Sequence, residues 1–130
     1  MYYEDRMIEL HDALLPLLRV EALTADEDAA NVAHTCTVTI ATKEVFPSRV
    51  QHTEIRETVK LFNEALRSQR YGEQTSMQYN ATDRTLRLHV EDMERLLSDF
   101  DILTQTARAS AHEKDVHSGS RGWTVGTALK

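Results

Sequence analysis

Six histidines and one cysteine are the side chains of this sequence best suited to bind a metal or act as a nucleophile. His34 and Cys36 are two positions apart in a threonine-rich run, so on a β-strand they would share a face. A structural zinc site needs four ligands, and no CxxC or HxxxH spacing supplies the other two. The sequence therefore predicts no metal site and no cofactor.

The carboxylates do not form a catalytic or ion-binding pattern either. Asp26 to Asp28 begins like a calcium loop, but positions six and twelve are Asn31 and Thr37 where Gly and Glu are required. Asp99 and Asp101 are two apart on an expected helix, so they do not face each other. The serines lack a GxSxG context. These patterns predict a protein that is not an enzyme.

Composition is that of a soluble globular protein. The 130 residues are 41% hydrophobic and 28% charged, enough for one domain with a single core. The net charge of −6 argues against a general nucleic-acid binder, although residues 43–87 hold eight basic and six acidic residues. There is no run of transmembrane length, the acidic N-terminus is unlike a secretory signal, and Cys36 has no disulfide partner. We expect a cytoplasmic protein with no membrane contact.

The segment Thr53 to Tyr71 is the strongest helix signal, and the other elements are arranged around it. Ile55, Val59, Phe62 and Leu66 step by four, three and four, which places them on one helical face. We expect this stripe to form the core or a dimer interface. Gly72 follows the helix and is expected to take the left-handed conformation that ends helices.

Helices and strands are expected both before and after this central helix. Pro16 should stop or kink the first helix, although a kinked helix continuing to Ala22 fits the pattern as well. In chain order we expect a helix at Tyr3–Leu15, strands at Leu17–Thr24 and His34–Ala41, the helix above, a hairpin of Ser76–Asn80 and Arg84–Val90, and a helix from Glu91 to about Ala111.

This order, α-β-β-α-β-β-α, predicts an α+β domain. We expect an antiparallel sheet of four or five strands with helices packed on one face. The other face would be rich in threonine and arginine. That face, or the exposed edges of the sheet, must be solvated or covered by a partner.

Glycine placement suggests where the domain ends. Three of the four glycines lie in the last twelve residues, so we expect the domain to span residues 1–112 and residues 113–130 to form a flexible tail. The tail contains Trp123, the only tryptophan, with Arg121 and Val125 beside it. These residues are the predicted partner-binding site, because tryptophan is enriched among interface hot spots. The alternative is that Trp123 folds back onto its own domain or onto a dimer mate.

Four arginines form the alternative site, one for nucleic acid. They lie around the junction of the central helix and the second hairpin: Arg67, Arg70, Arg84 and Arg87. Only Tyr71 and Tyr79 could stack on bases nearby.

The stretch from Thr53 to Leu103, read as helix, glycine, hairpin and helix in a small acidic protein, resembles the homodimeric chaperones of type III secretion. The resemblance implies a non-catalytic homodimer that binds another protein as a chaperone or assembly cofactor. It carries over no site residues. The alternative is an accessory protein of a phage or virus particle that contacts nucleic acid, found inside the virion.

Overall fold

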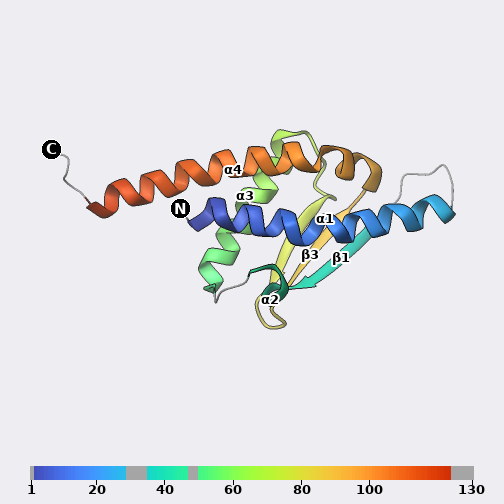
Figure 1. Ribbon diagram of the computed structural model, residues 1–130, viewed down its shortest axis with the longest axis horizontal. Helices are drawn as coiled ribbons and strands as arrows, with labels where there is room; N and C mark the ends of the chain where they lie inside the picture. Colours follow the sequence, from blue (N-terminus) through green and yellow to red (C-terminus); the bar gives the residue numbers. More distant parts are fainter. Residues whose placement is uncertain (1, 29–34, 47–49, 124–130) are drawn as a thin grey trace.

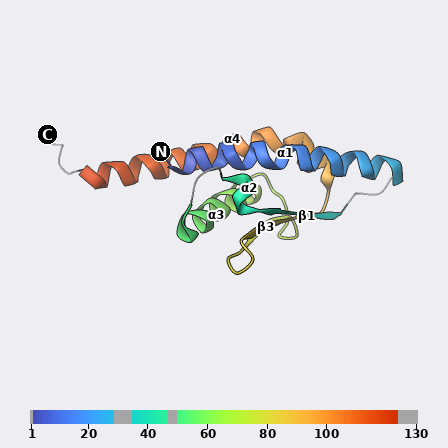
Figure 2. The same ribbon diagram turned by 60° about the horizontal axis from the view of Figure 1, so that its bottom comes forward.

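Two long helices lie side by side across one face of a small antiparallel sheet (Figures 1 and 2). The computed structural model describes residues 2–28, 35–46 and 50–123. The elements, in chain order, are α1 (Tyr2–Asp28), β1 (Cys36–Ala41), α2 (Thr42–Val45), α3 (His52–Ser68), β2 (Ser76–Asn80), β3 (Thr85–Val90) and α4 (Met93–Trp123). The α+β class and the antiparallel sheet are therefore confirmed.

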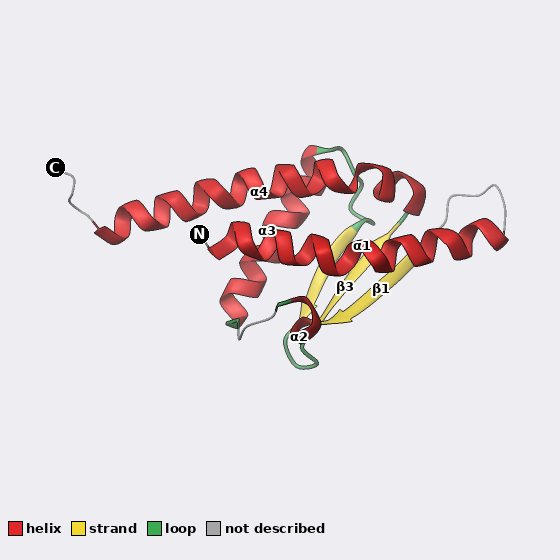
Figure 3. Cartoon of the chain, viewed as in Figure 1, coloured by secondary structure: helices red, strands yellow, loops and turns green. Residues whose placement is uncertain are grey.

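The described residues form three strands in the order β1-β3-β2, so the expectation of four or five was wrong (Figure 3). The missing strand is Leu17–Thr24, which lies within α1. Met7, Leu10, Leu14 and Leu18 are all at most 1% exposed, so a single helical stripe continues across Pro16. A proline inside a helix costs about 3 kcal/mol. Packing of this stripe against the rest of the core outweighs that cost.

Helix α3 matches its prediction in position and in its buried face. Ile55, Val59, Phe62 and Leu66 are between 0% and 9% exposed and belong to the core of the chain's own domain. Phe62 packs edge-on against Phe100 of α4, with ring centroids 6.3 Å apart.

The end of α3 differs from the prediction. The residue with positive φ is Arg70, at 69°, rather than Gly72. The Arg70 N–H donates to the Arg67 carbonyl, and the Tyr71 N–H donates to the Leu66 carbonyl. These two bonds are those of a Schellman motif, in which the residue after the cap adopts the left-handed conformation.

Helix α4 runs well past Ala111, where the sequence pattern suggested that it ends. Asp115 is only 9% exposed, and its carboxylate accepts hydrogen bonds from the backbone N–H groups of Tyr3 at 3.0 Å and Glu4 at 3.1 Å. Asp115 thus occupies the place of an N-cap for α1, although it lies on another helix. This contact therefore joins Asp115, which lies in the predicted tail beyond residue 112, to the start of α1.

Candidate binding surface

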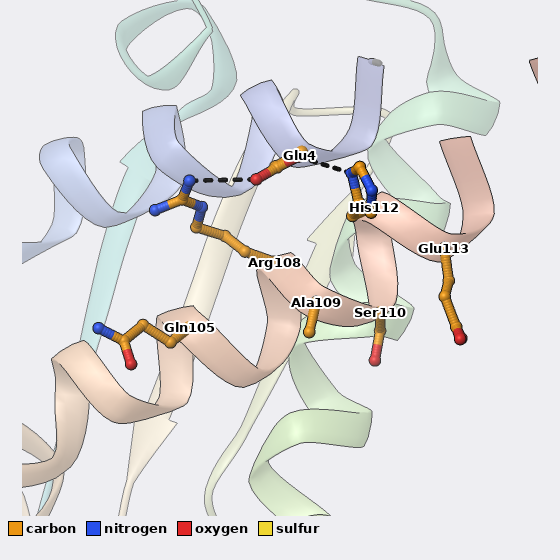
Figure 4. A pocket seen from close by; sticks show the side chains of 7 residues that line it. All are labelled: Glu4, Gln105, Arg108, Ala109, Ser110, His112 and Glu113. Carbon is orange, nitrogen blue, oxygen red and sulfur yellow. Dashed lines mark hydrogen bonds and ion pairs between the residues drawn. The ribbon is translucent and has the colours of Figure 1, made fainter. Parts of the chain in front are cut away.

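The side chains that could do chemistry on the helical side of the molecule gather in an open groove of about 730 Å³ beside the start of α1. Its lining residues are Glu4, Gln105, Arg108, Ala109, Ser110, His112 and Glu113. The Glu4 carboxylate lies between Arg108, at 3.1 Å, and Nδ1 of His112, at 3.2 Å (Figure 4). The hydrogen bond from Arg108 is the main reason that the pKa of Glu4 is lowered.

This groove has the features of an ion cluster that fastens α1 to α4. Both oxygens of the Glu4 carboxylate are paired, one with Arg108 and one with His112, and the Ser110 side chain points away from Glu4 (Figure 4). No hydroxyl group among the lining residues is hydrogen-bonded to the acid or the histidine. The groove therefore lacks the nucleophile and base pairing that covalent catalysis requires.

One other titratable group, His11, is held between side chains in the same way. His11 lies between Asp12, at 3.0 Å, and Asp101, at 2.8 Å, with its ring stacked on Phe100. Burial lowers the pKa of His11, but the two carboxylates outweigh burial and the pKa is raised. Both ring nitrogens are thus occupied.

The cysteine is not activated. Burial, reinforced by the nearby Glu21 carboxylate, raises the pKa of the Cys36 thiol to about 11. The thiol is therefore protonated at neutral pH, and it is the thiolate that reacts or binds metal. Within the described residues, no three side chains of His, Cys, Asp or Glu come together as a metal site. His34, the other member of the predicted pair, lies outside the described residues.

The face of the sheet turned away from the helices is open and polar, as the threonine and arginine pattern predicted (Figure 2). The pairing register places side chains on this face in three rows across the strands: Thr37, His89 and Ser76; Thr39, Arg87 and Gln78; Ala41, Thr85 and Asn80. None of the nine is acidic, although the chain as a whole carries a net charge of −6. This set of nine residues is called the open face below.

Arg87 stands at the centre of the open face. It is exposed and makes no ion pair or side-chain hydrogen bond with any other described residue. Beside it is a hollow of about 320 Å³, lined by Gln78, Tyr79, Asn80, Ala81, Thr85 and Arg87. None of these lining residues is acidic, and the Asn80 amide donates a hydrogen bond to the carboxylate of Asp83 in the adjoining turn. The hollow combines a guanidinium, two amides and a hydroxyl, which are groups able to donate hydrogen bonds to an anion.

Strand β1 forms an edge of the sheet, and its backbone has a definite polarity. The Thr42 N–H donates to the Arg84 carbonyl at 3.0 Å, which continues the β1–β3 register by one pair. Hydrogen-bonded and non-hydrogen-bonded pairs alternate in an antiparallel ladder. The alternate residues of β1 therefore direct their N–H and C=O groups outward, away from β3: Thr37, Thr39 and Ala41.

The two edges of the sheet differ in how their outward backbone groups are hydrogen-bonded. At the β2 edge, Asn63 of α3 donates to the Met77 carbonyl at 3.0 Å, and its side-chain oxygen accepts from the Met77 N–H at 2.8 Å. Asn63 thus substitutes for a neighbouring strand at that position. At the β1 edge, no hydrogen bond reaches the outward backbone groups of Thr37 or Thr39 from any residue of the described ranges, whereas the Ala41 carbonyl accepts the first hydrogen bond of α2. Neither arrangement has a local signal in the sequence, since each depends on which strand lies next to which helix.

The structure does not bring the four predicted arginines together. Arg67 donates to the carbonyls of Tyr71, Gly72 and Thr75, so it fixes the connection between α3 and β2. Arg70 follows α3, whereas Arg84 lies in the β2–β3 turn, at the other end of a strand about 17 Å long. Arg87 alone lies on the open face.

The residues predicted as a partner anchor lie at the end of the described chain. Trp123 is the last residue of α4, Arg121 lies in its final turn, and Val125 is outside the described residues. Their role in partner binding stays a prediction.

Comparison with known proteins adds no assignment: no protein family, curated protein or solved structure matches the chain. None of the helices in the described part of the chain has both the length and the apolar character needed to cross a lipid bilayer.

Proposed function

We propose that the protein is a non-catalytic protein-binding chaperone or assembly cofactor that holds an acidic, extended segment of a partner protein on the open face. The observation that carries this proposal is Arg87. It is an exposed cation with no carboxylate paired to it among the described residues, and it lies at the centre of a polar sheet surface that no helix covers.

The chemistry of the surface favours a carboxylate-bearing partner. Arginine presents planar donors that match a carboxylate in a bidentate geometry, and the neighbouring Gln78 and Thr85 add donors at the same hollow. None of the exposed residues of the open face carries a negative charge that would repel an anion. The same donors also fit phosphate, which is the form that the alternative function, contact with nucleic acid in a phage or virus particle, would take.

Fluorescence anisotropy with defined probes tests the proposal. The probes are a labelled glutamate–threonine repeat peptide, the matching lysine–threonine peptide and single-stranded DNA of the same length. Arg87→Gln should weaken binding of the acidic peptide about 10- to 150-fold, since a hydrogen bond to a charged group contributes about 1.5–3 kcal/mol. The matched control is Arg84→Gln, which removes the same charge from the exposed hairpin turn and should change affinity less than about twofold.

Two results would contradict the proposal. Equal losses in Arg87→Gln and Arg84→Gln would show that only net charge matters. Tighter binding of DNA than of the acidic peptide, with a steep salt dependence, would favour the nucleic-acid alternative.

A further inference from the structure

The structure assigns the β1 edge as the interface between two copies of this chain. We propose that β1 pairs antiparallel with β1 of a second copy about a two-fold axis at Thr39. The two sheets would then join into one of six strands, in the order β2-β3-β1-β1-β3-β2. The proposal does not depend on what the open face binds, and it can be tested on the chain alone.

The first argument is that β1 lacks the devices that normally prevent edge pairing. Proteins protect exposed edges with charged side chains, proline, bulges or a covering element. The segment Cys36–Ala41, with the sequence CTVTIA, has no charge and no proline. The opposite edge, β2, is covered by Asn63 at Met77, whereas the outward groups of Thr37 and Thr39 on β1 have no such cover among the described residues.

The second argument is that the strand is complementary to itself. With Thr39 opposite its own copy, Thr37 pairs with Ala41. The two Thr39 residues exchange hydrogen bonds across the axis, and each Ala41 N–H donates to the Thr37 carbonyl of the other copy. On the open face this register sets threonine against threonine, a favourable cross-strand pair. On the inner face it sets Val38 against Ile40, both of which are buried in the core, at 6% and 8% exposure. No like charges meet anywhere along the two strands.

The third argument comes from α1. Its C-terminal end continues past the sheet on the side of β1 (Figures 1 and 2). This part of the helix has Val20 and Leu23 exposed at 59% and 66%, the two highest values among the large hydrophobic side chains of the described chain. A second copy added at β1 would lie next to this overhanging end of α1.

The consequence for function is a larger binding surface. Pairing at β1 joins the two open faces edge to edge, so that two copies of Arg87 lie on one continuous sheet surface, related by the two-fold axis. A partner with two acidic segments, or one long segment, could then contact both copies.

The first test uses a substitution that removes one outward N–H. Thr39→Pro affects a backbone donor that is not bonded to β3, and proline is tolerated on edge strands at such positions. The matched control is Thr39→Ala, which shortens the same side chain and keeps the N–H. In sedimentation velocity at tens of micromolar, the wild type and Thr39→Ala should have twice the 14.8 kDa chain mass. Thr39→Pro should sediment as a monomer with an unchanged circular dichroism spectrum.

The second test does not depend on how well the proline variant folds. Residues opposite each other in an antiparallel pair have Cα atoms about 5.5 Å apart, within the range of a disulfide. In a Cys36→Ser background, Thr39→Cys should therefore form a covalent dimer on mild oxidation. The matched control, Gln78→Cys, is exposed on the open face but lies on β2, and it should stay uncrosslinked.

Several outcomes would overturn the assignment. These are a monomeric wild type in this concentration range, a folded Thr39→Pro variant that remains dimeric, and cross-linking of Gln78→Cys as efficient as that of Thr39→Cys. A dimer that persists in Thr39→Pro would place the contact on another surface.

Discussion

Asp115 provides the sharpest test of how this fold is held together. Its carboxylate accepts the N–H groups of Tyr3 and Glu4, so it caps α1 from a distance of more than one hundred residues in sequence. Asp115→Ala removes this acceptor and leaves two N–H groups in the first turn without their partner. We expect the variant to fold and to be less stable than the wild type.

The magnitude follows from three contributions. Loss of an N-cap acceptor costs about 1 kcal/mol and up to about 2 kcal/mol. Loss of the negative charge at the positive end of the α1 dipole costs a further 0.3–1 kcal/mol, approximately. Alanine is the better helix former at position 115 of α4, which returns at most about 0.7 kcal/mol. The free energy of unfolding should therefore fall by about 1–2 kcal/mol at neutral pH.

The effect should depend on pH in a definite direction. Burial by itself would raise the pKa of Asp115, but the hydrogen bonds that the carboxylate accepts, those from Tyr3 and Glu4 among them, outweigh it and the pKa is lowered. A carboxyl whose pKa is lower in the folded state stabilises the protein above its unfolded pKa of about 3.9. That contribution is lost as the pH falls through the folded value, so the difference between wild type and Asp115→Ala should shrink in acid.

Urea unfolding at a series of pH values measures both quantities. The control is Glu113→Ala, which removes an exposed carboxylate from the same helix and should change stability by less than about 0.5 kcal/mol. The reasoning is refuted if Asp115→Ala unfolds with the stability of wild type at pH 7, or if the two substitutions cost the same. The same reasoning about Asp115 also predicts that deleting residues 113–130 destabilises the domain. The sequence pattern alone predicted no such effect.

Two further substitutions test the core and the β2 edge. Phe62→Ala should cost about 3–5 kcal/mol in denaturant unfolding, because a side chain 2% exposed leaves a cavity against Phe100; Phe62→Leu should cost clearly less, and similar costs would show that the site collapses around either residue. Asn63→Ala leaves the N–H and C=O of Met77 without their side-chain partner and should cost about 1–3 kcal/mol. Glu64→Ala, on the exposed side of the same helix, is its control, and an equal loss there would mean that the edge contact contributes little.

Several elements of the fold are determined by local sequence. The apolar stripe of α3 repeats at the helical period, and β2 spans the Ser76–Asn80 segment that alternation predicted. Thr37 and Thr39 alternate with Val38 and Ile40, which correctly predicts one polar and one buried face for β1. These features are predictable because the helical and strand periods are properties of neighbouring residues.

Other features were decided by tertiary contacts. Pro16 is a local signal to stop a helix, yet α1 continues because its stripe on both sides of the proline packs into one core. Glycines at 119 and 122 are a local signal for a tail, yet the helix extends to Trp123, and Asp115 within it caps α1. At Pro16, packing of the buried stripe outweighs a local cost of about 3 kcal/mol. At Asp115, hydrogen bonds to the start of α1 stabilise the part of α4 beyond Ala111.

For the candidate binding surface too, some features are set by local sequence and others by tertiary contacts. Sequence alone determined that one face of the sheet is rich in threonine and arginine, since this depends only on alternation along each strand. Only the tertiary structure decided that Arg87 is separated from the other three arginines, that Asn63 covers one edge, and that the backbone of Thr37 and Thr39 is left open at the other. These features depend on strand order and register. Strand order and register are in turn set by how the apolar faces of distant elements pack together.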